Sequence, residues 1–153
     1  VTSHELVRQY LARIATYEDR FHAALYVNPR ALAEADTLDR ERAAGRIRGL
    51  LHGIPYAAKD LVNTAGVRTT FGSLLYEDNV PKEDAVANAR VKQAGGILFG
   101  KTTTPEFGHK ALTDAPLFGR TRNAWSAERT SGGSSGGDAA GDFPQGHRAD
   151  PAA

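Results

Sequence analysis

Lys59 is the first residue whose type and setting could do chemistry. It lies within residues 54–62, a stretch that is otherwise suited to burial. A buried lysine is rare unless it is paired or functional. Burial also lowers the pKa of the amine, because the charged form loses its hydration, and such an amine can accept a proton near neutral pH. The alternative is an ordinary surface pair of Lys59 with Asp60, although neighbours in an extended strand point to opposite faces.

A loop of glycine and serine at residues 131–137 is the second candidate. Glycine allows positive φ angles and leaves backbone N–H groups uncovered, so the loop could cradle an anion or a developing oxyanion. Composition alone equally allows a flexible linker. A candidate base elsewhere in the chain, Lys59, favours the functional interpretation. The loop residues are Gly132, Gly133, Ser134, Ser135, Gly136 and Gly137.

Two further glycine motifs fit a pattern but not its structural context. Residues 95–102 match the phosphate-binding P-loop pattern, which needs a loop and then a helix that starts at Lys101. The sequence instead predicts a helix before Gly95 and a buried strand at 97–99, so a nucleotide-binding module is the less favoured alternative. Residues 132–136 match a nucleophile elbow, but the polar residues 126–131 cannot form the core strand that it requires.

The elements that would position these residues follow from the hydrophobic pattern. Thr2 and Glu5 have capping-box spacing ahead of an amphipathic helix of about fifteen residues. A second helix is expected from Asn28 to near Gly45, and a third over residues 84–94. Short apolar pieces at 50–51 and 54–62 predict strands or turns of an α/β core, and 97–99 predicts a buried strand. Loop is expected at 66–79 and a helical turn near 105–108.

Composition limits the classes of function. The chain has 153 residues, of which 41% are hydrophobic, as expected for one folded domain. Its 19 Lys and Arg balance 18 Asp and Glu, which gives no electrostatic basis for a nucleic acid or membrane partner and favours a small neutral substrate. No apolar run could span a bilayer and residues 1–5 do not resemble a secretion signal, so we expect a cytoplasmic protein. No cysteine is present and five histidines lack ligand spacing, so no metal site is expected.

Taken together, the motifs resemble the amidase signature family of serine amidases. Three stretches carry the resemblance: residues 51–60 around Lys59, residues 95–107, and residues 118–137, which include Asn123 and Trp125 before the glycine–serine loop. The resemblance implies an α/β/α fold around a mixed central sheet. This chain would supply its N-terminal third at residues 1–141, followed by an irregular, disordered or aberrant tail at residues 142–153.

The resemblance also implies a Ser–Ser–Lys triad that hydrolyses amide C–N bonds. Lys59 would be the base and Ser134 the bridging serine, preceded by a cis bond between Gly133 and Ser134. Neutral Lys59 would take a proton through Ser134 from a nucleophilic serine, which attacks the amide carbonyl. No cofactor is called for. The substrate and oxyanion loop would be formed by Gly132, Gly133, Ser135, Gly136 and Gly137.

The family's nucleophile lies in a second Gly-Gly-Ser motif, which would fall past Ala153. We therefore expect a truncated or frame-shifted chain that is inactive alone, and the start at Val1 without Met also suggests a fragment. The alternative within the family is a fragment of the A subunit of glutamyl-tRNA(Gln) amidotransferase. Missing strand partners would leave apolar surface uncovered and allow self-association.

Overall fold

A three-stranded mixed sheet forms the centre of the computed structural model, which describes residues 1–141. The strand order is β1–β3–β2, with β1 (Ala24–Val27) antiparallel to β3 (Ile97–Thr102) and β2 (Pro55–Lys59) parallel to it. The hydrophobic pattern does not predict β1, because four residues between two helices are too few to show a period. The predicted tail at 142–153 lies outside the described residues.

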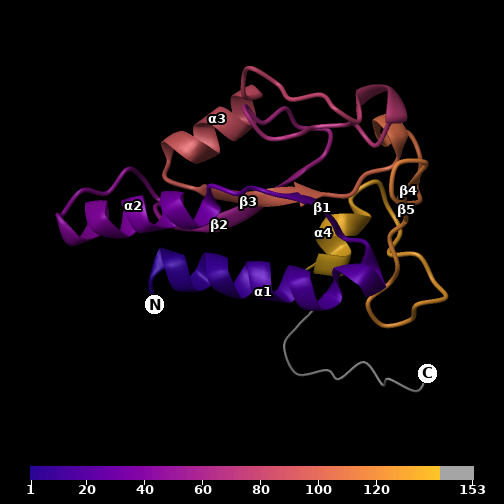
Figure 1. Ribbon diagram of the computed structural model, residues 1–153, viewed down its shortest axis with the longest axis horizontal. Helices are drawn as coiled ribbons and strands as arrows, with labels where there is room; N and C mark the ends of the chain where they lie inside the picture. Colours follow the sequence, from indigo (N-terminus) through magenta and orange to yellow (C-terminus); the bar gives the residue numbers. More distant parts are fainter. Residues whose placement is uncertain (142–153) are drawn as a thin grey trace.

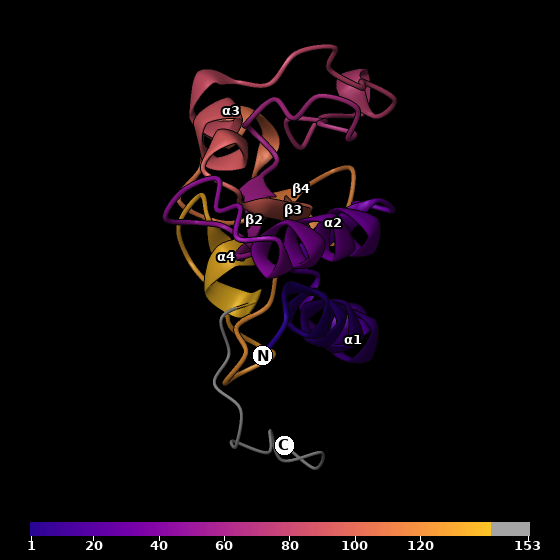
Figure 2. The same ribbon diagram turned by 90° about the vertical axis from the view of Figure 1, so that its left-hand side faces the viewer.

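Helices cover both faces of this sheet (Figures 1 and 2). On one side lie α1 (Ser3–Phe21), α2 (Ala31–Ala43) and α4 (Gly136–Gly141), and on the other lies α3 (Val86–Gln93). The predicted α/β/α architecture with a mixed sheet is therefore confirmed. None of the helices within residues 1–141 is both long and apolar enough to cross a membrane.

Smaller elements follow the central strands. Two short 3-10 helices, η1 (Leu74–Tyr76) and η2 (Glu106–Gly108), lie in the loops after β2 and β3. A two-stranded ribbon of β4 (Asp114–Ala115) and β5 (Gly119–Arg120) leads toward the glycine–serine loop. The helical turn predicted near 105–108 is thus confirmed.

The helix starts show where local signals hold and where tertiary contacts override them. At α1 the Thr2 hydroxyl accepts the Glu5 N–H at 3.1 Å and the Glu5 carboxylate accepts the Thr2 N–H at 2.7 Å, so the capping box is confirmed. α2 starts at Ala31 rather than at Asn28. The Asn28 side chain serves both segments: its Nδ2 donates to the Leu98 carbonyl at 2.8 Å, and its Oδ1 accepts the N–H of Arg30, just before α2, at 3.0 Å.

β3 is the buried centre of the core. Ile97 packs against Val7 of α1 and Ala35 of α2, whereas Leu98 belongs to a separate cluster with Val67. Successive side chains of a strand point to opposite faces. Both faces of β3 are therefore covered, and the buried strand predicted at 97–99 is confirmed.

Of the strand or turn predicted at residues 50–51, the structure forms the turn. Both residues lie in a turn, and Leu50 is 100% exposed. The His52 N–H donates to the Gly49 carbonyl at 3.1 Å, which closes the turn locally instead of pairing it with a neighbouring strand. β2 therefore begins only at Pro55.

The residues that follow the glycine–serine loop, 138–141, are helical. They form the last part of α4, in which Ala140 is 2% exposed and packs in a cluster with Phe21 and Ala23. Glycine-rich segments have low helix propensity. Docking against the end of α1 compensates for that low propensity.

Leu98→Ala should lower the free energy of unfolding by about 2–5 kcal/mol, because it leaves a cavity in the core. Leu50→Ala makes the same chemical change at a solvent-exposed site and should stay within about 0.5 kcal/mol of the wild type. Urea denaturation followed by circular dichroism measures both. Equal losses in the two variants would contradict the burial of β3.

Candidate functional site

The pairing of β2 with β3 places Lys59. It is the last residue of β2 and lies opposite Thr102 of β3. The next residue, Asp60, is directed elsewhere: its carboxylate accepts the Thr70 N–H at 3.0 Å and also the Thr70 hydroxyl. Lys59 and Asp60 therefore do not form the surface pair that was considered as the alternative.

The Lys59 amine meets the glycine–serine loop. Its Nζ donates to Ser134 Oγ at 2.7 Å, a contact between residues 75 positions apart. Gly132 and Gly133 precede Ser134 with φ angles of 77° and 51°, in the left-handed region that favours glycine. The structure thus brings together the two residues that the sequence singled out.

The rest of the loop divides into an exposed and a buried part. Gly133 and Ser135 are exposed to solvent, and Ser134 is half-buried. Gly136 and Gly137 are buried in the first turn of α4. The hydroxyl of Ser134 therefore lies at the boundary between the packed interior and solvent.

The bond between Gly133 and Ser134 differs from the prediction, because no peptide bond of residues 1–141 is cis. At a bond that does not precede proline, the trans form is favoured by about 3–4 kcal/mol. The Gly133 carbonyl accepts the Thr113 hydroxyl at 2.7 Å with the bond in the trans form.

Lys59 is half-buried, so it is more exposed than the apolar residues around it in the sequence predicted. Loss of hydration still lowers the pKa of its amine, and the carboxylate of Asp138 on α4 opposes this by raising it. A lowered pKa populates the neutral amine at lower pH than in free lysine. A neutral amine in contact with a serine hydroxyl has the geometry of a general base.

Lys101 is the fully buried lysine of the described chain, with 0% of its surface exposed. Its Nζ donates to the Val62 carbonyl and to the hydroxyls of Thr64 at 3.2 Å and Thr69 at 3.1 Å. Burial lowers the pKa of Lys101 to about 8, and nearby Asp60 opposes that shift.

The position of Lys101 also rules out a P-loop at residues 95–102. It lies within β3, where a phosphate-binding loop would need irregular backbone and the start of a helix. The segment 95–102 is therefore a turn and a core strand. One signal could have identified Lys101 as buried: a lysine that follows an apolar run and precedes three threonines, 102–104.

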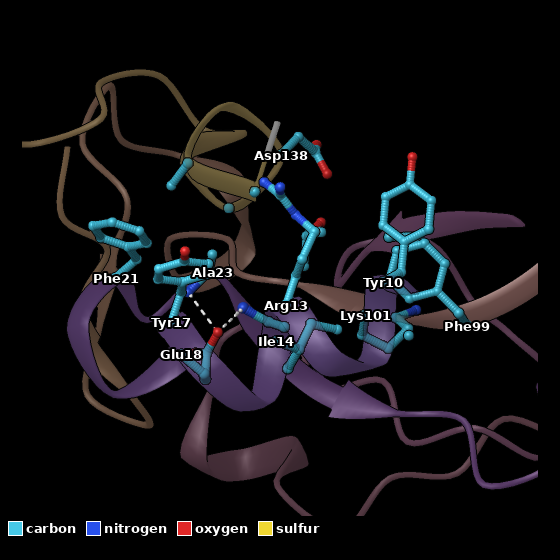
Figure 3. Close-up of a pocket in the computed structure, with 17 residues that line it drawn as sticks. Tyr10, Arg13, Ile14, Tyr17, Glu18, Phe21, Ala23, Phe99, Lys101 and Asp138 are labelled. Atoms are coloured by element: carbon cyan, nitrogen blue, oxygen red, sulfur yellow. Dashed lines mark hydrogen bonds between the residues drawn. The ribbon is translucent and has the colours of Figure 1, made fainter. Parts of the chain in front are cut away.

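A cavity of about 210 Å³ lies between α1, β3 and α4 (Figure 3). Aromatic rings contribute to its wall, including Tyr10 and Phe99, which stack with centroids 5.0 Å apart. Neither Lys59 nor Ser134 lines it. The cavity is thus beside the lysine–serine pair and not at it.

Glu18 is the acidic side chain of α1 in this wall. Its carboxylate accepts the N–H groups of Ala23 at 3.1 Å and Ala24 at 2.8 Å, as Figure 3 shows, and burial raises its pKa. Glu18 therefore fixes the chain between α1 and β1. No group of three His, Asp or Glu residues within 1–141 is arranged to hold a metal ion.

Comparison with known proteins identifies relatives over the described part of the chain. A family model described as Amidase matches residues 5–141. The A subunit of glutamyl-tRNA(Gln) amidotransferase from Roseiflexus sp. (strain RS-1) is 47% identical over 141 residues, which cover 92% of this chain and 29% of that protein.

Solved structures agree with these matches. The peptide amidase from Stenotrophomonas maltophilia superposes with a TM-score of 0.83 at 38% identity, over 90% of this chain and 30% of that one. A bacterial aryl acylamidase of the amidase signature family gives a TM-score of 0.83 at 27% identity, over 90% of this chain and 29% of that one. The chain spans less than a third of the length of these relatives.

Asp138→Asn should lower the pKa of Lys59 further below its ordinary value of 10.5, because it removes the negative charge that stabilises the ammonium form. A pH titration of the lysine side-chain NMR signals measures the shift. Asp78→Asn, which removes an exposed carboxylate that faces Arg68, should leave the Lys59 titration unchanged. A Lys59 pKa that stays constant or rises in Asp138→Asn would contradict the interaction.

Proposed function

The chain belongs to the amidase family, and we propose that it carries the general base and the bridging serine of an amide-hydrolysing site. The bond from Lys59 Nζ to Ser134 Oγ at 2.7 Å is the observation that carries this proposal. A lysine and a serine in contact can relay a proton from a nucleophile. The lowered pKa of Lys59 supports the role of its amine as acceptor.

In the proposed reaction, a serine nucleophile attacks the carbonyl carbon of a small amide. Its proton passes to Ser134 Oγ, while the proton of Ser134 passes to the neutral amine of Lys59. The C–N bond then breaks, and the leaving nitrogen takes a proton back along the same route. Water, or another nucleophile, afterwards releases the acyl group from the enzyme.

Under this proposal, the 153 residues do not include the nucleophilic serine. The sequence has no serine after Ser135, and it spans 29% of the length of its amidotransferase relative. We propose that the loop contacts the substrate, since Gly133 and Ser135 are exposed and accessible to a small amide. Gly132 belongs to the same part of the loop, whereas Gly136 and Gly137, which the sequence also suggested for this role, are buried in the first turn of α4 and support the loop from behind.

The relay can be tested by placing residues 5–141 in the Stenotrophomonas peptide amidase in place of its matching segment. The chimera should hydrolyse peptide amides, and Lys59→Met or Ser134→Ala should lower kcat at least about 100-fold, because the general base or the bridge is lost. Lys82→Met, at an exposed lysine, serves as the matched control and should leave kcat unchanged.

The isolated chain should not turn over a simple anilide. Full activity of the Lys59→Met chimera would reject the base assignment. Turnover by the isolated chain that disappears in Lys59→Met would instead reject the missing nucleophile.

The second candidate function is that of an amidotransferase made of several subunits, in which this chain would be part of one subunit. The identity of 47% to the amidotransferase relative exceeds the 38% to the peptide amidase, which favours it. Both candidates use the same lysine–serine relay and differ in whether other subunits are required. For either one we propose a cytoplasmic location, which fractionation of the native host would test.

We also propose that residues 1–153 associate with a second copy when they are produced alone. β1 and β2 each pair with β3 on one side only in the described sheet. Large apolar side chains are exposed as well, among them Leu50 at 100% and Leu75 at 85%. Uncovered strand edges and apolar patches promote association.

Light scattering after size exclusion should therefore give a mass above 16.4 kDa that grows with concentration. The double variant Leu50→Lys and Leu75→Lys should lower that mass, whereas Glu77→Lys, which changes charge without removing apolar surface, should not. Concentration-independent monomers would reject self-association. Co-expression with the other amidotransferase subunits separates the two candidates, since a stable complex supports the second and its absence supports the first.

A further inference from the structure

Thr113, the residue before β4, binds the loop of Ser134 through its hydroxyl, which contacts the Gly132 carbonyl at 3.4 Å and makes two shorter hydrogen bonds. It is 0% exposed. Its Oγ1 donates to the Gly133 carbonyl at 2.7 Å and accepts the Gly136 N–H at 2.9 Å. A threonine hydroxyl has one proton to donate and lone pairs to accept with, so both bonds form at once. One side chain therefore clasps the backbone on both sides of Ser134.

The loop backbone leaves no room for side chains at Gly136 and Gly137. A Cβ atom at Gly136 would lie 2.5 Å from Thr113 Oγ1 and 2.3 Å from Ser131 Oγ, closer than real contacts allow. At Gly137 a Cβ atom would lie 2.5 Å from the backbone nitrogen of Thr103, just beyond β3. The glycines let the backbone pack directly on both neighbours, which argues against a flexible linker.

We infer that Thr113 is a positioning residue that holds the Ser134 hydroxyl within hydrogen-bond reach of Lys59. The functional meaning of this inference rests on the proposed function, but its geometry can be tested without turnover. Without the Thr113 hydroxyl, the Gly133 carbonyl and the buried Gly136 N–H each lose a partner, which favours a loop that moves out to water. Ser134 would move with it, because it lies between the two anchored peptides.

Three variants separate the hydroxyl from the space that it fills. Thr113→Val keeps the shape and removes the hydroxyl, whereas Thr113→Ser keeps the hydroxyl and removes the methyl group. Thr121→Val is the matched control at a threonine that is also 0% exposed. The Thr121 hydroxyl donates to the His22 carbonyl at 2.6 Å and contacts the Thr103 hydroxyl at 2.7 Å, and neither partner is a residue of the loop.

The experiment measures the Lys59 titration and the amide exchange of Gly136 by NMR on the 153-residue chain. In Thr113→Val the Lys59 pKa should rise toward its ordinary value of 10.5, because the released amine regains hydration. Exchange at Gly136 should become about fivefold faster or more, the factor expected for one lost hydrogen bond. Thr113→Ser should match the wild type in both, and Thr121→Val should lower stability with neither change.

Wild-type values of both quantities in Thr113→Val would overturn the inference, and so would equal changes in Thr121→Val. If Thr113→Val does not fold, the wild-type chain still tests the inference. Its Thr113 hydroxyl proton should exchange slowly with water and give an NMR cross-peak to the Gly136 N–H. The absence of that signal refutes the clasp. Failure here is distinct from failure of the proposed function, which is read from the activity of the Lys59→Met chimera.

Discussion

The parallel pairing of β2 with β3 is the constraint on which the site depends. It brings the carboxyl ends of the two strands to one edge, with Lys59 opposite Thr102. A strand that slips by one residue sends every side chain to the other face. Such a slip in β2 would turn Lys59 toward the cluster of Ala58 and Leu98 and away from Ser134. The contact between Lys59 and Ser134 thus depends on register as much as on the identity of the two residues.

The two lysines beside this pairing show that burial alone does not identify a functional amine. Burial lowers the pKa of both Lys59 and Lys101. An ammonium group has three donors, and Lys101 directs them at the carbonyl and two hydroxyls that surround it, which ties β3 to the loop after β2. Lys59 is half-buried and meets a serine at the edge of solvent. The chemistry of the acceptor distinguishes the amine suited to proton transfer from the structural one.

Local signals were sufficient for some elements and not for others. The capping box of Thr2 and Glu5 and the buried strand at 97–99 depend on near neighbours, and both form as predicted. β1 and α4 depend on distant contacts, since β1 pairs with β3 and α4 docks on the cluster that includes Phe21. The proximity of Lys59 and Ser134 was anticipated only through the resemblance, and their catalytic roles remain predictions. Thr113 has no local signature, because its role exists only once the loop has docked.

A bridging serine needs a fixed backbone and a hydroxyl that is free to exchange its proton. The clasp of Thr113 on Gly133 and Gly136 meets the first requirement, and the half-buried position of Ser134 meets the second. Groups held in place before reaction need no reorganisation when the proton moves. The contacts described for this geometry come from β2, from Thr113, from the packing of Gly137 on Thr103 and from the loop itself, and none of them involves a nucleophile. The geometry of the lysine–serine pair can therefore be measured independently of any catalytic activity.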